Sequence, residues 1–409
     1  MSGISQNEML VGLDVGTSKV VAVVAETSAD GNIEVVGLGT QPSRGLRNGV
    51  VVDIESTTDA IKKSIHEAET MAGCHISSCY VGISGSHVRG LNSNGVVPIR
   101  DGEVKYSDVD RVIETAQAMA IPADQKLLHV LPRDYIIDNQ PGIKEPLGMA
   151  GARLEAKVHL VTCSENSSQN IHTCVASCGL DIEAFVLEQL ASSYSVLTSD
   201  ERELGVCLID IGCGTTDLAV FTEGSISYTD VIPLAGDHVT NDIANALRTP
   251  PTQAEDIKQR YGCAVSALTQ PDELMKVPGM GGRPEREMSR QTLADVLERR
   301  YVEIFSMAQQ KLSLSSFESV IPAGVVLTGG ASKVEGAVEL AEEVFHAPVR
   351  IGSPNTIGGF TEVIHNPVYA TAVGLLLYGH KQMQEDHMNY IHRDKNILNR
   401  LTRWFGGNL

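Results

Sequence analysis

The feature that most constrains this sequence is a strand–turn–strand pattern that occurs twice, over residues 10–25 and 206–221. In each copy an apolar run carries an aspartate near its end, and a turn rich in glycine and hydroxyl residues leads straight into a second apolar run. Short apolar runs bounded by such turns predict buried strands, and the immediate return predicts a β-hairpin. Because the pattern is repeated, we expect two duplicated halves whose hairpins face each other.

The turns of both hairpins are suited to binding an anion. Glycine permits positive φ and a close approach of a ligand to the backbone. Successive turn N–H groups form a concave anion nest, and the serine and threonine hydroxyls add donors. Asp14 and Asp210 can hold a metal ion or orient a water. A tight hairpin with a polar tip would explain either copy alone. The turn residues expected to contact phosphate are Gly16, Thr17, Ser18, Lys19, Gly212, Gly214, Thr215 and Thr216.

Residues 325–332 form a third motif, in which a short apolar run enters a Gly329-Gly330 turn and a helix is predicted from Ser332. Backbone without side chains at this turn could lie against a flat purine and ribose. The three motifs together resemble the nucleotide site of the actin-like ATPase superfamily, which includes actin, the heat-shock chaperone ATPases and the sugar kinases. The sequence contains neither a Walker-type P-loop nor a Rossmann fingerprint.

This resemblance implies a site for ATP and Mg²⁺ between the two hairpins, with Asp14 and Asp210 near the metal and the attacking water. In the superfamily an acidic residue or glutamine of the crossover positions that water, and Glu188 lies in the corresponding stretch. A Glu-x-x-Lys pair touches the nucleoside in relatives, which points to Glu255 and Lys258; a solvated i, i+3 ion pair is the alternative. The resemblance also assigns four loop residues to the nucleotide: Gly236, Gly329, Gly330 and Ala331.

Composition limits the classes of function. A chain of 409 residues can bury two or more cores. Its formal net charge of −19 argues against general nucleic-acid binding, because a phosphate backbone requires a basic surface. The cysteines form no CxxC pair, and Cys174 and Cys178, one helical turn apart, favour buried thiols over a metal site, which is consistent with a reducing cytoplasm. No secretory signal or membrane-spanning run is predicted.

The predicted elements imply an α/β protein with the actin-like ATPase fold: duplicated ribonuclease-H-like halves, an inserted small α+β subdomain and a C-terminal amphipathic helix. The insertion follows the first strand–helix–strand unit, where short strands, one helix from Ser107 and several prolines replace the earlier pattern. In superfamily terms we expect the first part of subdomain 1A over 1–85, the inserted subdomain 1C over 86–162, the rest of 1A and the crossover over 163–203, the first part of subdomain 2A over 204–230, subdomain 2B over 231–302, the rest of 2A with the return to 1A over 303–379, a flexible linker over 380–394 and the amphipathic helix over 395–407.

The second half contains a predicted mobile loop and a group of arginines that could bind a partner. Residues 270–288 carry several prolines and glycines and are predicted to form a mobile loop, and a long helix is predicted over residues 290–314. Arginines gather around the start of this helix and give an acidic protein a local basic patch. A solvated face is the simpler explanation, and a docking surface for an acidic partner peptide is the alternative. The patch comprises Arg283, Arg286, Arg290, Arg299 and Arg300.

The C-terminal segment carries an amphipathic pattern after a polar stretch. On a helix its apolar side chains fall within an arc of about 120°, the basic side chains lie outside that arc, and the segment contains no acid. Such a helix suits the interface of an anionic membrane, whereas docking on the protein's own core is the alternative. Basic residues near an anionic leaflet contribute roughly 1 kcal/mol each, which gives a weak, reversible anchor. The apolar face comprises Ile397, Leu398, Leu401, Trp404 and Phe405, and the basic residues are Lys395, Arg400 and Arg403.

The three nucleotide motifs, the insertion and the tail resemble, over the whole chain, the FtsA family of bacterial cell-division proteins. The family implies a peripheral protein on the cytoplasmic face of the inner membrane that binds ATP, hydrolyses it weakly or not at all, and forms actin-like filaments. It also implies partners: the C-terminal peptide of FtsZ docked near Arg299 and Arg300, further copies of the chain, later cell-division proteins and anionic lipid. A sugar kinase of the same fold, or another actin-like scaffold such as a pilus-assembly protein, is the alternative.

Overall fold

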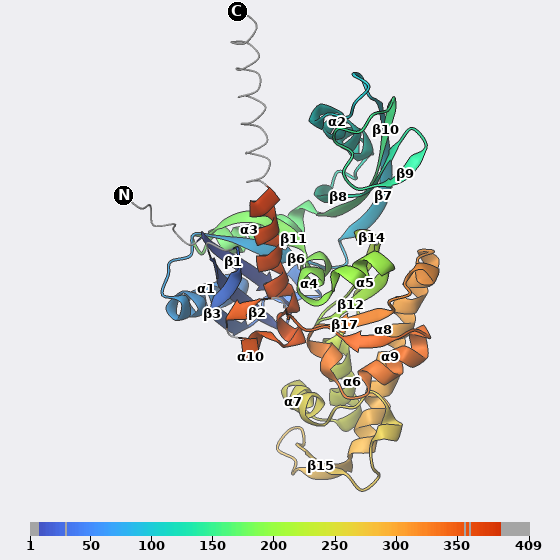
Figure 1. The fold of residues 1–409 in the computed structure, drawn as a ribbon. Helices are drawn as coiled ribbons and strands as arrows, with labels where there is room; N and C mark the ends of the chain where they lie inside the picture. Colours follow the sequence, from blue (N-terminus) through green and yellow to red (C-terminus); the bar gives the residue numbers. More distant parts are fainter. Residues whose placement is uncertain (1–7, 29–30, 356, 360, 386–409) are drawn as a thin grey trace, which may run out of the picture.

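The computed structural model describes residues 8–28, 31–355, 357–359 and 361–385. Two sheets, one in each half of the molecule, form its framework (Figure 1). The first sheet has the order β11-β6-β1-β2-β3-β19 and the second has the order β14-β13-β12-β17-β18. Their strands are β1 (Glu8–Val15), β2 (Lys19–Thr27), β3 (Ile33–Pro42), β6 (Ser78–Ile83), β11 (Asp181–Leu187) and β19 (Gly358–Gly359), then β12 (Val206–Ile211), β13 (Thr216–Thr222), β14 (Ser225–Ile232), β17 (Val325–Thr328) and β18 (Val349–Ile351).

The two sheets share one plan. Each begins with three antiparallel strands, β1 to β3 or β12 to β14. Each then adds two parallel strands beside the first of these, β6 and β11 or β17 and β18. The hairpins β1–β2 and β12–β13 therefore occupy equivalent places, and the predicted duplication of the two halves is confirmed.

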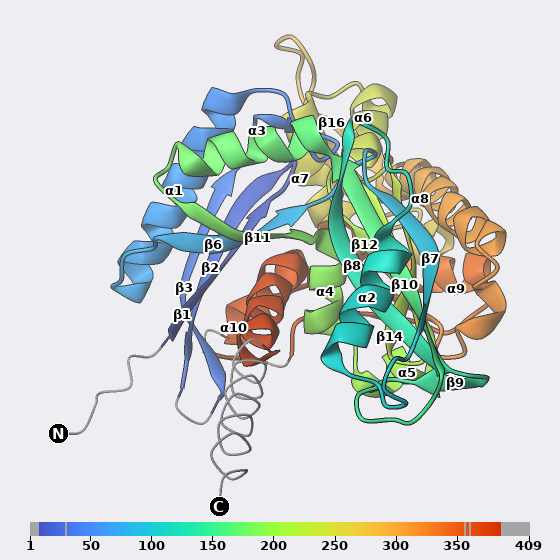
Figure 2. The ribbon, with the colours of Figure 1, turned by 90° about the horizontal axis from the view of Figure 1, so that it is seen from above.

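Helices cover the first sheet on both faces. Helices α1 (Ile54–Ala72) and α3 (Glu165–Ala176) lie on its outer face, whereas α4 (Glu188–Val196) and a helix over residues 370–385 lie on the side of the second half (Figure 2). The bounds of α1 follow from its caps. The Asp53 side chain accepts a hydrogen bond from the Ser56 N–H at 3.1 Å, and Gly73 ends the helix with a φ of 66°.

Four helices of the second half lie on the face of its sheet that is turned away from α4. They are α6 (Gly236–Leu247), α7 (Pro251–Tyr261), α8 (Arg290–Leu314) and α9 (Ala337–Phe345). The long helix α8 has the bounds predicted from the sequence, and its buried side includes Leu293, Leu297, Ile304 and Ala308, together with Tyr301 and Phe305. Helices α6, α8 and the second sheet enclose one apolar core. This half is thus a self-contained layer of sheet and helices.

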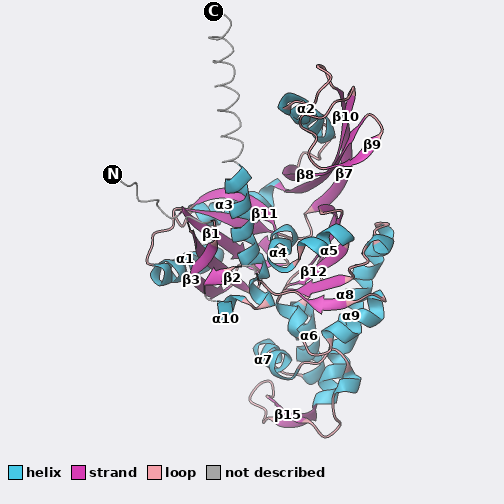
Figure 3. Cartoon of the chain, in the orientation of Figure 1, coloured by secondary structure: helices cyan, strands magenta, loops and turns pink. Residues whose placement is uncertain are grey.

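Residues 89–164 form the inserted subdomain. An antiparallel sheet in the order β7-β10-β8-β9 packs against α2 and encloses its own apolar core (Figure 3). The insertion also contacts β14 of the second half. His159 Nε2 lies 2.9 Å from Thr229 Oγ1 of β14, and His159 Nδ1 lies 2.7 Å from Asn92 Oδ1 within the insertion. Its elements are β7 (Arg89–Pro98), α2 (Tyr106–Gln117), β8 (Gln125–Ile137), β9 (Gln140–Ile143) and β10 (Arg153–Ser164).

Three local predictions differ from the structure. The predicted mobile loop over 270–288 contains a two-stranded hairpin, β15 (Leu274–Val277) with β16 (Arg286–Ser289), because Met275 and Val277 are buried against the core. The helix predicted from Ser332 is a short 3-10 turn over Gly330–Lys333, and α9 begins later.

The third difference concerns the start of the predicted linker. Residues 380–385 continue the preceding helix. Two contacts hold this end of the helix: Lys381 Nζ lies 5.4 Å from the centre of the Tyr194 ring, and Met383 packs against the core of the first half. The rest of the linker and the amphipathic tail from Lys395 lie outside the described residues.

Short elements complete the fold: β4 (Leu46–Arg47), β5 (Val50–Val51), α5 (Ser199–Leu204) and α10 (Thr361–Ile364), with 3-10 turns over Ser266–Leu268, Glu318–Val320 and Pro367–Tyr369. Within the described ranges, no helix combines the length and the apolar character needed to cross a membrane.

Candidate nucleotide-binding site

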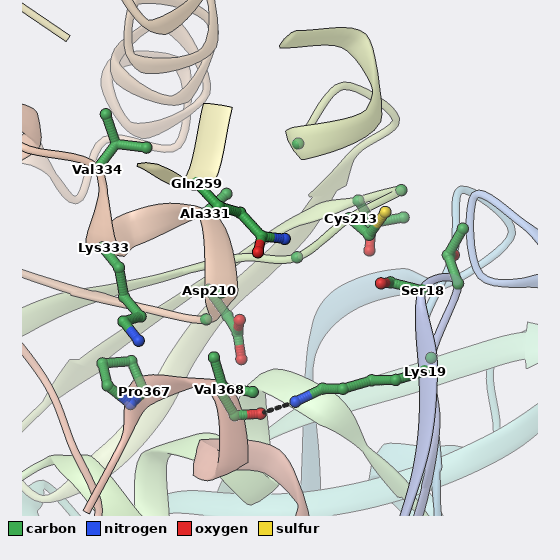
Figure 4. Close-up of a pocket in the computed structure, with 18 of the residues that line it drawn as sticks. Ser18, Lys19, Asp210, Cys213, Gln259, Ala331, Lys333, Val334, Pro367 and Val368 are labelled. Atoms are coloured by element: carbon green, nitrogen blue, oxygen red, sulfur yellow. Dashed lines mark hydrogen bonds between the residues drawn. The ribbon is translucent and has the colours of Figure 1, made fainter. Parts of the chain in front are cut away.

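A cavity of about 650 Å³ opens between the two halves. This volume lies within the usual range for small-molecule sites. Both hairpin turns, the Gly-Gly loop after β17, helix α7 and the start of α4 contribute to its wall (Figure 4). The structure thus brings together the predicted residues Asp14, Gly16, Thr17, Ser18, Lys19, Glu188, Asp210, Gly212, Gly214, Thr215, Gly236, Glu255, Lys258, Gly329, Gly330 and Ala331.

Thr216 is the predicted turn residue that does not line the cavity. Its hydroxyl donates to the Leu234 carbonyl at 2.8 Å, and its side chain is fully buried. The reason is strand alternation: Thr216 is the first residue of β13, so its side chain points to the face opposite that of its neighbour in the turn. We therefore no longer assign Thr216 to the phosphate.

The two turns have the same backbone geometry. The Gly16 N–H donates to the Lys19 carbonyl at 3.0 Å, and the Gly212 N–H donates to the Thr215 carbonyl at 3.0 Å. The strand register aligns the hairpins in the same way. Thr215 is thus the counterpart of Lys19. The hydroxyl pairs that look alike in the sequence are not equivalent in space, because Thr17 and Ser18 align with Cys213 and Gly214.

The two halves touch closely at the mouth of the hairpins. A Cβ at Gly214 would lie 2.7 Å from Thr17 Oγ1 and 2.9 Å from Asn48 Cα. Thr17 Oγ1 in turn accepts a hydrogen bond from the Gly49 N–H at 3.1 Å. The second turn can approach the first this closely only because position 214 has no side chain.

Carboxylates gather at the floor of the cavity. Burial raises the pKa of Asp14 to about 6 and that of Asp217 to about 7, and it raises the pKa of Glu188 well above its usual range. Burial likewise raises the pKa of Asp210, which hydrogen bonds from Ser192 and Thr371 oppose. A cluster of buried carboxylates favours binding of a cation, because the cation offsets their negative charge.

Lys19 is the buried cation beside these acids. Burial lowers the pKa of its ammonium to about 8, and Asp14 opposes this shift. Its Nζ donates to the Val368 carbonyl at 2.7 Å and lies 4.6 Å from the centre of the Tyr369 ring (Figure 4). The Lys19 ammonium therefore offsets only part of the negative charge that these carboxylates carry when they are ionised.

A divalent cation fits this donor set only together with a ligand. Asp14 and Asp210 face the cavity with hard oxygen donors, which suit Mg²⁺. Among the described residues, however, no cluster of three carboxylate, imidazole or thiol groups is arranged to hold a metal by itself. Mg²⁺ commonly uses one or two carboxylates and completes its shell with water and phosphate oxygens. The residues present fit that mode of binding.

The predicted Glu255–Lys258 pair forms part of the cavity wall. Lys258 Nζ lies 2.7 Å from Glu255 Oε2, and it donates to Thr240 Oγ1 at 2.8 Å and to the Gly236 carbonyl at 3.1 Å. The Lys258 side chain is only 9% exposed. The pair is therefore not a solvated surface pair, although the glutamate is partly exposed.

The structure adds residues that the sequence did not single out. Asp217 lies in the second motif but carried no assignment, and its carboxylate accepts hydrogen bonds from Ser84 and Thr215. Lys333 follows the Gly-Gly loop and points into the cavity (Figure 4). Val368 comes from a turn with no motif, so no sequence signal could have placed it. Further lining residues are Gly49, Cys213, Gln259 and Thr371.

The arginine patch beside α8 is largely paired. Arg300 lies 2.6 Å from Asp242 and 2.6 Å from Glu303, and Arg290 forms ion pairs with Glu273 and Glu335. Arg286 donates to a backbone carbonyl. Arg299 is exposed and, within the described part of the chain, forms no ion pair. The patch therefore presents less free positive charge than its sequence indicates.

Comparison with known proteins gives matches along the whole chain. A family model described as "Cell division protein FtsA" matches residues 207–374, and one described as "SHS2 domain inserted in FTSA" matches residues 85–162. The cell-division protein FtsA of Pseudomonas aeruginosa is 59% identical over 417 aligned positions that cover 100% of both chains. The corresponding protein of Escherichia coli is 47% identical, covering 94% of this chain and 92% of its own.

Solved structures share the fold at low identity. A PilM–PilN type IV pilus biogenesis complex gives a TM-score of 0.68 at 18% identity, covering 91% of this chain and 98% of the other. MreB5 of Spiroplasma citri bound to ADP gives a TM-score of 0.57 at 16% identity, covering 93% of this chain and 99% of the other. At such identities the likeness concerns the actin-like fold alone, and it confirms the predicted fold class.

Proposed function

The chain belongs to the FtsA family and is an actin-like cell-division protein, and from this premise we propose that it binds ATP with Mg²⁺ between its two halves. The observation that carries the proposal is the pair of equivalent turns that line one cavity. Each turn offers backbone N–H groups to an anion, so a polyphosphate between them would be held from both sides. The structure of MreB5 with ADP shows that another protein of this fold binds a nucleotide.

Different residues of the cavity would bind the phosphates, the cation and the nucleoside. We assign the phosphates to the two turns and to the Lys19 ammonium, and the cation to Asp14 and Asp210. The Gly-Gly loop after β17 would lie against the nucleoside, with Glu255 and Lys258 opposite it. Mg²⁺ would neutralise charge on the phosphates.

Glu188 is the residue that we assign to the attacking water. It is the first residue of α4 and lines the cavity. Because burial raises its pKa well above the usual range, the carboxyl holds its proton more firmly than an exposed glutamate does. A carboxyl at this place can orient a water toward the phosphates, and the family resemblance implies weak hydrolysis or none.

An equilibrium titration with a fluorescent ATP analogue, with Mg²⁺ and with EDTA, tests the nucleotide proposal. We expect one nucleotide per chain, bound more tightly with Mg²⁺. Transfer of phosphate to small acceptors such as sugars would instead favour a kinase. A chain that binds neither ATP nor ADP would contradict the proposal.

We further propose that the protein polymerises at the cytoplasmic face of the inner membrane through its C-terminal tail. The support is the amphipathic sequence from Lys395, which lies outside the described residues. A single tail with three basic residues is a weak anchor. Polymerisation would present many tails at once and strengthen attachment by avidity.

Flotation with vesicles tests the tail directly. The full chain is compared with a chain ending at Asp394 and with the full chain carrying Trp404→Glu, on vesicles with and without anionic lipid. We expect only the unaltered full chain to float, and only with anionic lipid, more strongly when it is polymerised. Equal flotation of all three chains would contradict the anchor.

We expect this protein to bind the C-terminal peptide of FtsZ and so to hold FtsZ at the membrane. Cell-division proteins that join the division site later are the other proposed partners. Arg299 is exposed on α8, whereas Arg300 is already paired with Asp242. We expect Arg299→Glu to weaken binding of the FtsZ peptide by fluorescence anisotropy. Arg153→Glu, on the inserted sheet, is the matched control. Unchanged peptide binding by Arg299→Glu would move the docking site elsewhere.

A further inference from the structure

The second hairpin holds its aspartate with two buried hydroxyl groups. Ser192 Oγ donates to Asp210 Oδ2 at 2.6 Å, and Thr371 Oγ1 lies 3.4 Å from the same oxygen. The two hydroxyls are also 3.0 Å apart. Because Ser192 gives its single proton to the carboxylate, Thr371 donates to Ser192 or to Asp210. The three groups therefore form one connected hydrogen-bonded cluster.

Both hydroxyls act on one oxygen of the carboxylate and leave the other to the cavity. Asp210 Oδ1 accepts no hydrogen bond from the residues that the structure describes. It lies beside Gly329, where an added Cβ would be only 2.3 Å from it. Oδ2 is thus fixed by hydroxyls, and the close approach of Gly329 limits rotation of the carboxylate. The free oxygen belongs to a residue of the cavity wall.

The first hairpin has no such support. Asp14 is the counterpart of Asp210, and within the described ranges its side chain forms no hydrogen bond. Its neighbours are the Lys19 ammonium and the Asp210 carboxylate, which act through charge. The hydroxyl pair is therefore a specific feature of the second hairpin and not a consequence of the duplicated backbone.

The two hydroxyls come from helices that cannot move independently. Ser192 lies in α4, and Thr371 lies in the first turn of the helix over residues 370–385. A Cβ at Gly374 would lie 1.9 Å from the Ala191 carbonyl oxygen, so the two helices touch through their backbones. Ser195 Oγ also donates to the Ala370 carbonyl at 2.7 Å. The close backbone contact at Gly374 fixes the two hydroxyls relative to each other.

We propose that Ser192 and Thr371 are positioning residues that orient Asp210 toward a divalent cation bound with the phosphates. The inference rests on the proposed nucleotide function and names residues that act on the cation through Asp210. Groups that orient a metal ligand in this way typically change metal affinity by 10- to 100-fold when removed. The effect should therefore appear in the Mg²⁺ dependence of nucleotide binding.

The test is a titration of free Mg²⁺ at fixed fluorescent ATP analogue. In Ser192→Ala and Thr371→Val we expect the Mg²⁺ midpoint to rise on the order of tenfold. Affinity for the analogue in EDTA should stay near that of the unaltered chain, because the phosphate-binding turns are intact. Thr371→Ser keeps the hydroxyl and should restore the normal midpoint.

Ser195→Ala is the matched control. It removes a hydroxyl between the same two helices but one that does not touch Asp210, so its Mg²⁺ midpoint should be unchanged. Thermal unfolding in EDTA without nucleotide verifies that each variant folds, and Ser192→Ala alone carries the test if Thr371→Val does not. An unchanged midpoint in Ser192→Ala, or an equal loss of affinity in EDTA and Mg²⁺, overturns the inference. Absence of nucleotide binding by the unaltered chain overturns the proposed function and the inference with it.

Discussion

The two hairpins have the same backbone and different side chains. Lys19 in the first corresponds to Thr215 in the second, as the turn hydrogen bonds and the strand register show. One step further along, Val20 and Val21 correspond to Thr216 and Asp217. The first hairpin therefore carries the buried cation, and the second carries an additional buried acid.

This difference indicates how a duplicated fold becomes an asymmetric site. Both turns can receive an anion through their N–H groups, because that property belongs to the backbone. The charged side chains of the two hairpins then interact with different parts of the ligand. Lys19 suits the phosphates, whereas Asp210, with its fixed carboxylate, suits the cation.

Removal of the positive charge of Lys19 should have the largest effect. Lys19→Met keeps the length of the side chain but removes the charge. Because hydrogen bonds to charged groups contribute about 1.5–3 kcal/mol, we expect ATP affinity to fall on the order of 100-fold. The measurement is the equilibrium titration with Mg²⁺, and Lys62→Met on the exposed side of α1 is the control. An affinity within twofold of the unaltered chain would remove Lys19 from the site.

A side chain at the contact between the halves should have the next largest effect. Gly214→Ala places a Cβ within 2.9 Å of Asn48 Cα, so the turns must separate. Overpacking of this kind costs about 1–3 kcal/mol, and we expect ATP affinity to fall by about tenfold or more. Ser18→Ala, at the equivalent position of the first turn, introduces no clash and should cause a smaller loss. Equal losses would show that the close approach of the halves is unimportant.

The additional acid should make stability depend on pH. The folded-state pKa of Asp217 is about 7, against 3.8 for an exposed aspartate, so the native state binds more protons than the unfolded state between these values. Stability without ligand is therefore lost as pH rises through the folded-state pKa, by about 1.4 kcal/mol between about pH 6 and pH 8. Asp217→Asn should flatten this slope in urea unfolding with EDTA. A slope equal to that of the unaltered chain would contradict the assignment.

Loss of one neutral donor should have the smallest effect. Thr215→Ala removes a hydroxyl that lines the cavity, and a neutral hydrogen bond contributes about 1 kcal/mol, so ATP affinity should fall by about fivefold. Thr216→Ala is the matched control, because its hydroxyl bonds the Leu234 carbonyl away from the cavity. We expect that variant to keep its ATP affinity. The reverse order of effects would mean that the turn is aligned incorrectly.

Much of the fold could be predicted from local pattern. The bounds of α8 follow from its apolar stripe, and those of α1 follow from Asp53 and Gly73, which cap it. The hairpin over β15 and β16 was missed, because prolines and glycines obscure two short strands whose burial depends on tertiary packing. Helix over residues 380–385 was missed because it depends on contacts with residues far away in the sequence.

The candidate site was predictable where its residues share a motif. The glycines and aspartates of the turns stand out because few other patterns place them after a buried strand. The alignment of the two turns was not predictable, since Thr17 and Ser18 resemble Thr215 and Thr216 in sequence but not in register. Ser192 gave no signal, because a serine inside a helix carries no sign of the carboxylate it will reach.

The most direct test of the account is a double-mutant cycle across the two hairpins. ATP affinity with saturating Mg²⁺ is measured for the unaltered chain, Lys19→Met, Thr215→Ala and the double variant. If both turns hold one polyphosphate, the two losses interact by at least about 0.5 kcal/mol, because release of one end of the ligand weakens its hold at the other. Losses that add within about 0.3 kcal/mol would contradict a single ligand held between the halves.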